Sequence, residues 1–244
     1  MKSPDEISAL PPDPSEHDLS AQLIVYLEHI NDNLRRTGWL ISVADAIKTN
    51  PSILGNSVGV IPATGDEHED LLRAAVILTH AYLEDFLRML GRTLLPLASK
   101  EVLDEIPLTG TGRQAQKFFL GSLMRHLDKA VEQVVQESAD EYLDNYTFNN
   151  GTQVMQFLAK LGIKVDSDLT TLNQMIQRRH SIAHRGDKVR SKISEKYEMQ
   201  PISALDVIDW VKATNDFVNS VVRLVIEQKT PPESYLRNYF KRDL

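Results

Sequence analysis

The chain has 244 residues, of which 42% are apolar and 25% charged, so it can bury a core of ordinary size. It has no cysteine, which excludes disulfides, thiolate metal sites and a cysteine nucleophile, and it has no apolar run of about eighteen residues that would span a membrane. Its net charge of −7 argues against a protein that coats nucleic acid non-specifically, because such proteins are usually basic.

The N-terminal quarter of the chain is predicted to be distinct from the rest. Residues 1–16 are polar and rich in proline, which favours a flexible leader over a secretory signal and, with the lack of cysteine, a cytoplasmic location. Apolar residues then recur at helical spacing before and after Gly38. We therefore predict two N-terminal helices and a loop over 17–65, forming an extra helical layer.

The strongest helical pattern follows over 67–95, where apolar residues cover most sides, as is typical of a central helix. Further helices are predicted at 114–143, at 152–162, at 168–184, and from the capping pattern Ser203-x-x-Asp206 onward. Residues 187–200 are predicted to be a polar, basic loop, and 231–244 a short tail. No strand pattern is evident, so the fold class is all-α, with an up-and-down helical bundle over 66–230.

The helix at 168–184 carries a charge where an apolar residue is expected. On a helical wheel at about 100° per residue, Arg179 lies within an apolar stripe made by Leu172, Met175, Ile176, Ile182 and Ala183. Arginine is rarely buried alone, because an unpaired buried charge is unfavourable. This break in the pattern indicates either a functional group or a specific ion pair, for which Glu84 and Asp85 are candidates.

Two histidines share one edge of the same helix. His180 and His184 are four residues apart, so their side chains lie one above the other. Arg179 is about 140° from His184 around the helix, too far for an easy contact within one chain. A two-fold dimer, or a bend near Gly186, would bring these groups into one cleft, and we favour the dimer.

This segment resembles the RiboL-PSP branch of the HEPN superfamily. The family motif is an arginine, a polar residue, a few intervening positions and a histidine, matched here by Arg179, His180, Ser181-Ile182-Ala183 and His184. The flanking sequence over 171–186 is similar to that branch, and so is the segment 81–86, which carries an aromatic residue and Glu84. The resemblance covers residues 67–228 and implies a HEPN-type bundle.

The resemblance also implies a metal-independent endoribonuclease without a cofactor, with its site at a homodimer interface. In RNA the 2′-hydroxyl serves as the nucleophile, so the protein must supply an acid, a base and positive charge for the phosphate. Histidine has a suitable pKa for proton transfer, and the arginine fork fits two phosphate oxygens. We assign Arg179 to phosphate stabilisation, His184 to acid or base catalysis, His180 to positioning and Glu84 to a supporting role.

Basic residues cluster around the motif in an otherwise acidic chain. We expect Arg178, Arg185, Lys188 and Arg190 to contact the RNA backbone, although a solvated loop would have the same composition. The family resemblance further implies a place in a bacterial defence or toxin–antitoxin system. An antitoxin or another defence protein is therefore an expected partner.

Several alternatives stay open. The chain is alternatively a non-catalytic HEPN module that binds RNA or protein in a larger assembly, or a helical scaffold with Arg179 in an internal ion pair. His184 alternatively satisfies carbonyl groups at a helix end. His180 and His184 have the spacing of two zinc ligands, but Ser181 replaces the metalloprotease glutamate and no third ligand is evident, so we predict no metal site.

Overall fold

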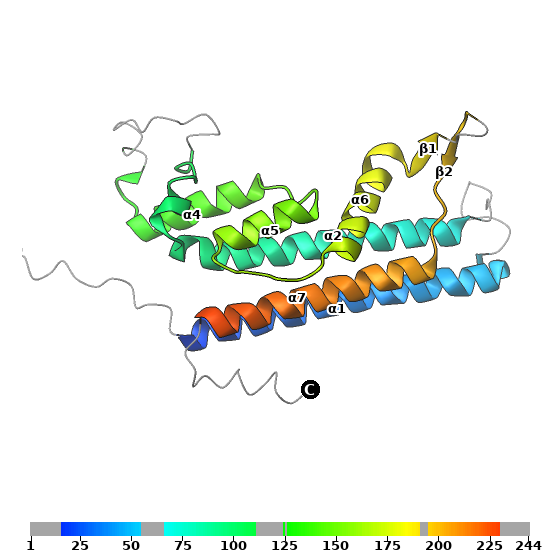
Figure 1. Ribbon diagram of the computed structural model, residues 1–244, viewed down its shortest axis with the longest axis horizontal. Coiled ribbons are helices and arrows are strands. Elements are labelled where there is room, and N and C mark those ends of the chain that lie inside the picture. The colour runs from blue at the N-terminus through cyan, green and yellow to red at the C-terminus, as the bar shows by residue number, and fades with distance from the viewer. Residues whose placement is uncertain (1–15, 55–65, 111–123, 125, 191–194, 230–244) are drawn as a thin grey trace, which may run out of the picture.

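The computed structural model describes residues 16–54, 66–110, 124, 126–190 and 195–229 (Figure 1). These residues form seven α-helices, which are α1 (Glu16–Thr49), α2 (Glu67–Leu94), α3 (Lys100–Leu103), α4 (Val131–Asp144), α5 (Gly151–Lys160), α6 (Thr170–Arg185) and α7 (Ala204–Lys229). Two 3-10 turns, η2 (Pro51–Leu54) and η3 (Leu95–Leu97), and two short strands, β1 (Lys188–Arg190) and β2 (Tyr197–Met199), complete the described structure. The prediction of an all-α fold is confirmed.

Three long helices form the body of the molecule. α1 and α7 lie side by side, and α2 packs against both (Figure 1). Two hydrogen bonds show that α1 and α2 are antiparallel: Tyr26 contacts Thr93 at 2.8 Å, and His29 contacts Asp85 at 3.2 Å. Residue numbers therefore increase along α1 as they decrease along α2. The N-terminal helix is thus part of the bundle itself.

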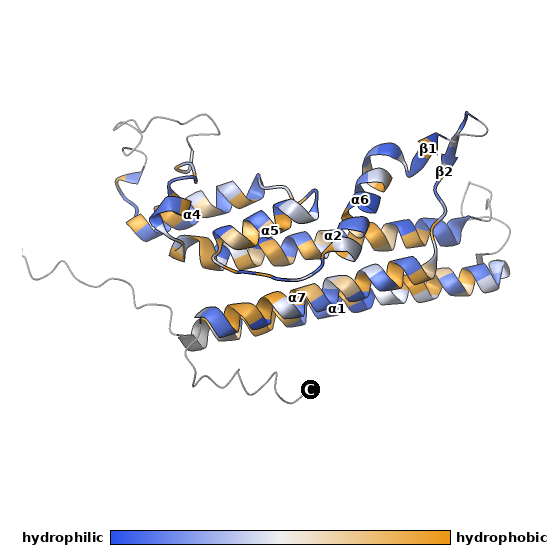
Figure 2. Cartoon of the chain, in the orientation of Figure 1, coloured by the Kyte–Doolittle hydropathy of each residue, from blue (hydrophilic) through white to orange (hydrophobic). Residues whose placement is uncertain are grey.

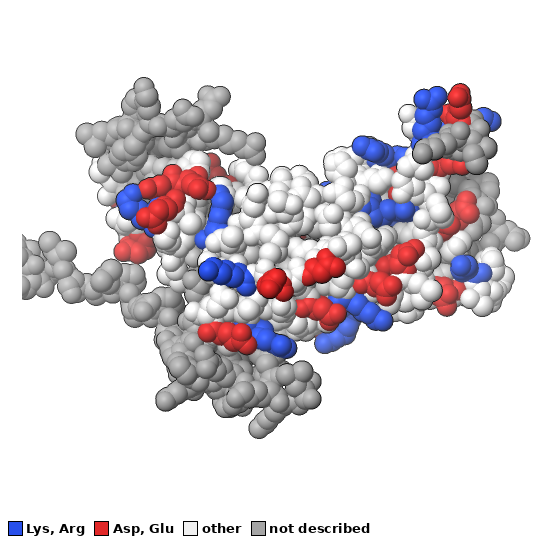
Figure 3. All heavy atoms as spheres, in the orientation of Figure 1, with Lys and Arg blue, Asp and Glu red and all other residues white. Residues whose placement is uncertain are grey.

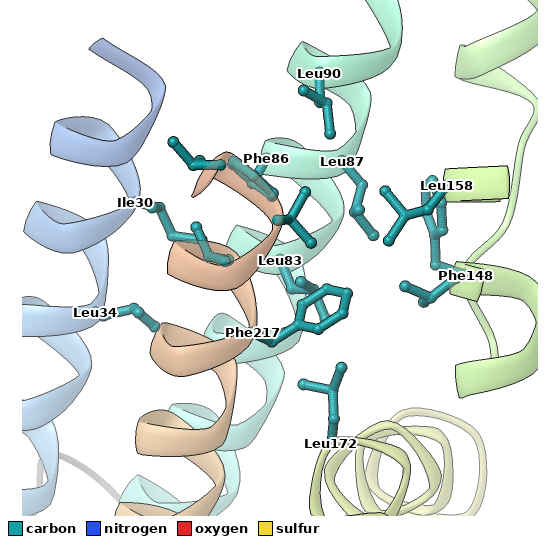
Figure 4. Close-up of a cluster of buried hydrophobic side chains, with 14 of the residues drawn as sticks. Ile30, Leu34, Leu83, Phe86, Leu87, Leu90, Phe148, Leu158, Leu172 and Phe217 are labelled. Atoms are coloured by element: carbon teal, nitrogen blue, oxygen red, sulfur yellow. The ribbon is translucent and has the colours of Figure 1, made fainter. Parts of the chain in front are cut away.

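One apolar core joins these helices to α5 and α6. Ile30 and Leu34 of α1, Leu83, Phe86, Leu87 and Leu90 of α2, Leu172 of α6 and Phe217 of α7 are all buried in it (Figure 4). Figure 2 shows the corresponding division, with apolar stripes along the long helices and a hydrophilic α6 end and hairpin. Burial of this apolar surface is the main force that holds the bundle together.

α4 and α5 cover a different part of α2 and depend on a glycine to approach it. A Cβ atom at Gly91 would lie 2.7 Å from Phe157 Cζ and 2.8 Å from Leu143 Cδ2, closer than side chains can pack. The absence of a side chain therefore allows both residues to sit directly against the α2 backbone. Asn150 caps α5 by accepting a hydrogen bond from the Gln153 amide at 2.9 Å.

The predicted break at Gly38 is wrong, because α1 continues through it from Glu16 to Thr49. No atom lies within 4 Å of the place a Gly38 Cβ would occupy, so the residue is on an uncrowded side of the helix. A single glycine weakens a helix by only about 1 kcal/mol, which the packing of α1 on α2 and α7 offsets. Of the predicted leader 1–16, only Glu16 is described, and the predicted tail 231–244 lies outside the described residues.

Two further expectations need correction. Of the helix predicted over 114–143, α4 begins at Val131, because Ala130 is extended, with φ −65° and ψ 148°; residues 114–123 and 125 of the prediction lie outside the described residues. The predicted loop 187–200 contains the antiparallel pair β1–β2, whose strands are too short and too exposed for an alternating apolar pattern. Within the described ranges, none of the helices is long and apolar enough to cross a membrane.

Candidate functional site

Helix α6 begins in the core and ends in solvent. Asp168 accepts hydrogen bonds from the amide of Thr170 at 2.9 Å and from its hydroxyl at 2.6 Å, which fixes the first turn. The first half of α6 buries Leu172, Met175 and Ile176, whereas the last turn is exposed and leads away from the long helices (Figure 1). The helix ends at Gly186, whose φ of 57° lies in the left-handed region.

Arg179 lies where the buried stripe of α6 meets the surface. Its side chain is half-buried, as are Ile182 and His180, whereas Ala183, expected within the stripe, is exposed. Among the described residues Arg179 makes no hydrogen bond or ion pair, so the predicted pairing with Glu84 or Asp85 is absent there. The donors of this guanidinium group therefore have no partner among the described residues.

His180 and His184 lie together on one edge of α6. Their ring centroids are 4.5 Å apart with an interplanar angle of 49°, which confirms that the two rings are neighbours. His180 is half-buried and His184 is exposed, so the pair extends from the helix surface into solvent. No hydrogen bond joins either ring to Arg179 in the described structure, as expected for residues on different sides of a helix.

Helix α2 contributes a third histidine, His80, which is buried. His80 is 1% exposed and its Nε2 lies 3.1 Å from the carbonyl oxygen of Phe148. Burial lowers the pKa of His80; Glu84 opposes this shift and the charge of Arg179 adds to it. α2 packs against α6, the helix that carries the motif.

Glu84 lies one helical turn after His80 on α2, and its ion-pair partner is Arg88 and not Arg179. Its Oε2 is 3.5 Å from Nη1 of Arg88, and its Oε1 is 4.0 Å from Nδ1 of His80. The guanidinium of Arg88 also donates to the carbonyl of Tyr146 at 3.1 Å. Glu84 thus belongs to a polar cluster next to α6, and its supporting role stays a prediction.

Arg178 is not a free surface cation. Its Nη2 donates to Asp187 Oδ2 at 2.8 Å and to the carbonyl of Pro201 at 2.9 Å, and its Nη1 donates to Gln200 Oε1 at 2.8 Å. Asp187 has no exposed surface and also accepts from Nε of Arg73 at 2.9 Å. We call Arg73, Arg178, Asp187 and Gln200 the hairpin clamp, because they join α2, α6 and both strands. Arg178 is thus engaged in contacts within the protein, and its expected contact with RNA stays a prediction.

The other expected cations are on the surface. Arg185, Lys188 and Arg190 are all exposed, at the end of α6 and on β1. Figure 3 shows lysine and arginine side chains at this projecting corner, beside a surface that dips toward α5. Within the described residues there is no cluster of three or more histidine or acidic side chains with the arrangement of a metal site.

Comparison with known proteins identifies the family. The sequence model of the RiboL-PSP-HEPN family matches residues 40–227, from the last third of α1 to the last turn of α7. The chain matches no curated protein sequence and no solved structure. The match includes the motif on α6 and the polar cluster on α2, and it suggests a ribonuclease or an RNA-binding module. Because the match extends over well more than half of its length, the chain belongs to the RiboL-PSP-HEPN family, a member of the HEPN superfamily.

Proposed function

We propose that this protein is a metal-independent endoribonuclease that cleaves RNA through attack of the 2′-hydroxyl on the adjacent phosphate. The observation that supports this most directly is the state of Arg179, which is half-buried at the motif position without an ion-pair partner in the described structure. A structural ion pair would leave no charge to offer a substrate. An arginine held against the protein with free donors suits a phosphate whose charge grows in the transition state.

The two imidazoles provide the proton transfers. His184 is exposed, so an RNA phosphate and its 2′-hydroxyl have access to it, and we assign it acid or base catalysis. His180 packs against His184 and limits the orientations its ring can take, which is a positioning role. Exposed Arg185, Lys188 and Arg190 then attract the RNA backbone, while Glu84 supports the site from α2.

We further propose that the working site is assembled in a homodimer. Arg179 and His184 lie about 140° apart around an ideal helix, so a phosphate between them is reached more easily from two copies of α6. The last turn of α6 is exposed in the described structure, so it is accessible to a second chain. A regulated activity of this kind suits a defence or toxin–antitoxin system, in which an antitoxin or another defence protein restrains it.

The test is cleavage of RNA by the full chain in the presence of a chelator. We expect products with 2′,3′-cyclic phosphate ends, and loss of cleavage on Arg179→Ala or His184→Ala in a folded protein. Arg35→Ala is the matched control, because Arg35 is an exposed arginine on α1. Undiminished cleavage by the two motif variants would remove the motif from the mechanism. RNA binding without any products would instead indicate a non-catalytic module.

A further inference from the structure

The β1–β2 hairpin has a face with an unusual composition. Directly opposed residues in an antiparallel pair lie on the same face, and the register pairs Lys188 with Met199 and Arg190 with Tyr197. These four side chains therefore share one face, while Val189 and Glu198 share the other. Two cations and two apolar side chains, one of them aromatic, thus form what we call the hairpin face.

The hairpin face is open in the described structure. Tyr197 is 72% exposed and Met199 43% exposed, and both strands are exposed along their whole length. A single exposed aromatic residue is common on protein surfaces. What distinguishes this face is that the Tyr197 ring lies opposite Arg190 and shares its side of the strand pair with Lys188. Arg190 Nε donates to the backbone carbonyl of Glu195 at 3.4 Å, and its Nη2 lies 3.9 Å from the Glu195 carboxylate. Both contacts are exposed to solvent and therefore weak, so a phosphate can compete with them for the guanidinium.

The base of the hairpin is fixed, although the hairpin itself projects. Asp187 precedes β1 and Gln200 follows β2, so the two residues lie opposite each other at the base of the strand pair, where the Gln200 amide donates to the Asp187 carbonyl at 2.9 Å. Arg73 and Arg178 each donate to the Gln200 carbonyl at 3.0 Å, so α2 and α6 both hold this base. A surface held in this way loses less freedom when a ligand binds.

The hairpin face is also close to the proposed reaction centre. Lys188 is four residues after His184, and four residues extend the chain by at most about 14 Å. An RNA strand whose phosphate lies at His184 therefore passes the hairpin within a short distance. Cations spaced along a strand contact phosphates, and an exposed aromatic ring stacks on an unpaired base.

We propose that the hairpin face binds single-stranded RNA next to the cleavage site, with Lys188 and Arg190 on phosphates and Tyr197 stacked on an unpaired base. The proposal rests on the proposed ribonuclease function and gives it a substrate class. Duplex RNA keeps its bases inside the helix, so Tyr197 has no ring to stack on there. The preference for single strands should therefore depend on Tyr197, whereas the cations should help both forms.

The experiment measures RNA binding separately from cleavage. Full-length protein with His184→Ala is titrated against a fluorescent single-stranded oligoribonucleotide and against the same sequence closed into a stem, with anisotropy as the readout. Adding Tyr197→Ala should weaken single-strand binding about tenfold and leave stem binding within about twofold. Tyr197→Phe should keep the affinity, because it keeps the ring. Trp39→Ala, which removes an exposed aromatic side chain from α1, is the matched control and should change nothing.

The outcomes are distinguishable. Unchanged single-strand binding by Tyr197→Ala, or an equal loss for both RNA forms, overturns the stacking proposal even if the protein cleaves RNA. A change in the oligomeric state of Tyr197→Ala in size-exclusion chromatography, with RNA affinity intact, shows instead that the face is a protein interface. If the His184→Ala protein binds no RNA, this proposal is overturned too. If the unsubstituted protein prefers single-stranded RNA but does not cleave it, only the proposed ribonuclease activity is overturned.

Discussion

The buried carboxylate of Asp187 accepts a hydrogen bond from Nε of Arg73 at 2.9 Å, although 114 positions separate the two residues. Both groups are buried, with side-chain exposures of 0% for Asp187 and 7% for Arg73. The pair fixes the end of α6 to the start of α2. His184 precedes Asp187 by three residues, so the position of the proposed catalytic histidine depends on this pair.

Replacing the Asp187 carboxylate should destabilise the fold. Asp187→Asn keeps the size of the side chain and its tolerance of the left-handed backbone, since Asp187 has a φ of 58°. It removes the buried negative charge that Arg73 and Arg178 share, and leaves Arg73 with Glu69 and Asp70 alone. We expect a loss of about 2 to 4 kcal/mol in the free energy of unfolding, measured by urea denaturation. Asp70→Asn is the control, because Asp70 meets the same Arg73 at the surface and should cost less than about 1 kcal/mol. Equal effects of the two variants would contradict the clamp.

Stability should fall on mild acidification because of His80. Burial lowers the pKa of His80 in the folded state below its ordinary value of 6.5. As the pH drops through 6.5, the unfolded chain takes up a proton that the folded chain refuses, so the free energy of unfolding decreases. Chemical denaturation at a series of pH values between about 7.5 and 5.5 measures this slope. His80→Gln should flatten it, and a slope that the variant leaves intact would assign the effect to other groups.

Mixing inactive variants tests whether the site is shared between two chains. If each site takes Arg179 from one chain and His184 from the other, a dimer of Arg179→Ala with His184→Ala has one intact site of two. Random exchange makes about half of the dimers mixed, so about one quarter of the normal cleavage rate should return. Each variant exchanged with itself is the control. No recovery after proven subunit exchange would mean that the two residues act within one chain.

Two glycines should respond to alanine in opposite directions. Gly186 has a φ of 57° with open space around it, so Gly186→Ala meets only backbone strain and should lower stability by about 1 to 2 kcal/mol. Gly38 lies inside α1, also in open space, so Gly38→Ala should raise stability by about 0.5 to 1 kcal/mol. Thermal and urea unfolding of both variants measure the difference. Changes of the same sign would contradict the assignment of Gly186 as the left-handed end of α6.

Sequence patterns predicted the elements that depend on residues close together in the chain. The period of apolar residues predicted α2, α5 and α7, and Gly186 marked the end of α6, because helix periodicity and capping depend on neighbours a few residues apart. The same local signals misplaced the break at Gly38 and missed the hairpin. Packing of α1 along α2 and α7 outweighs one glycine, and two three-residue strands are too short to show a pattern of their own.

The sequence by itself determined the family, the all-helical fold and the proximity of His180 to His184, since each depends on a motif or on spacing along one helix. Only the tertiary structure decided which arginine of the adjacent pair is used internally. Arg178 and Arg179 are neighbours in the chain, but the helix turns them to different surroundings: Arg178 donates to the buried Asp187, whereas Arg179 makes no ion pair among the described residues. That difference arises because Asp187, Arg73 and Gln200 meet only when distant segments pack together.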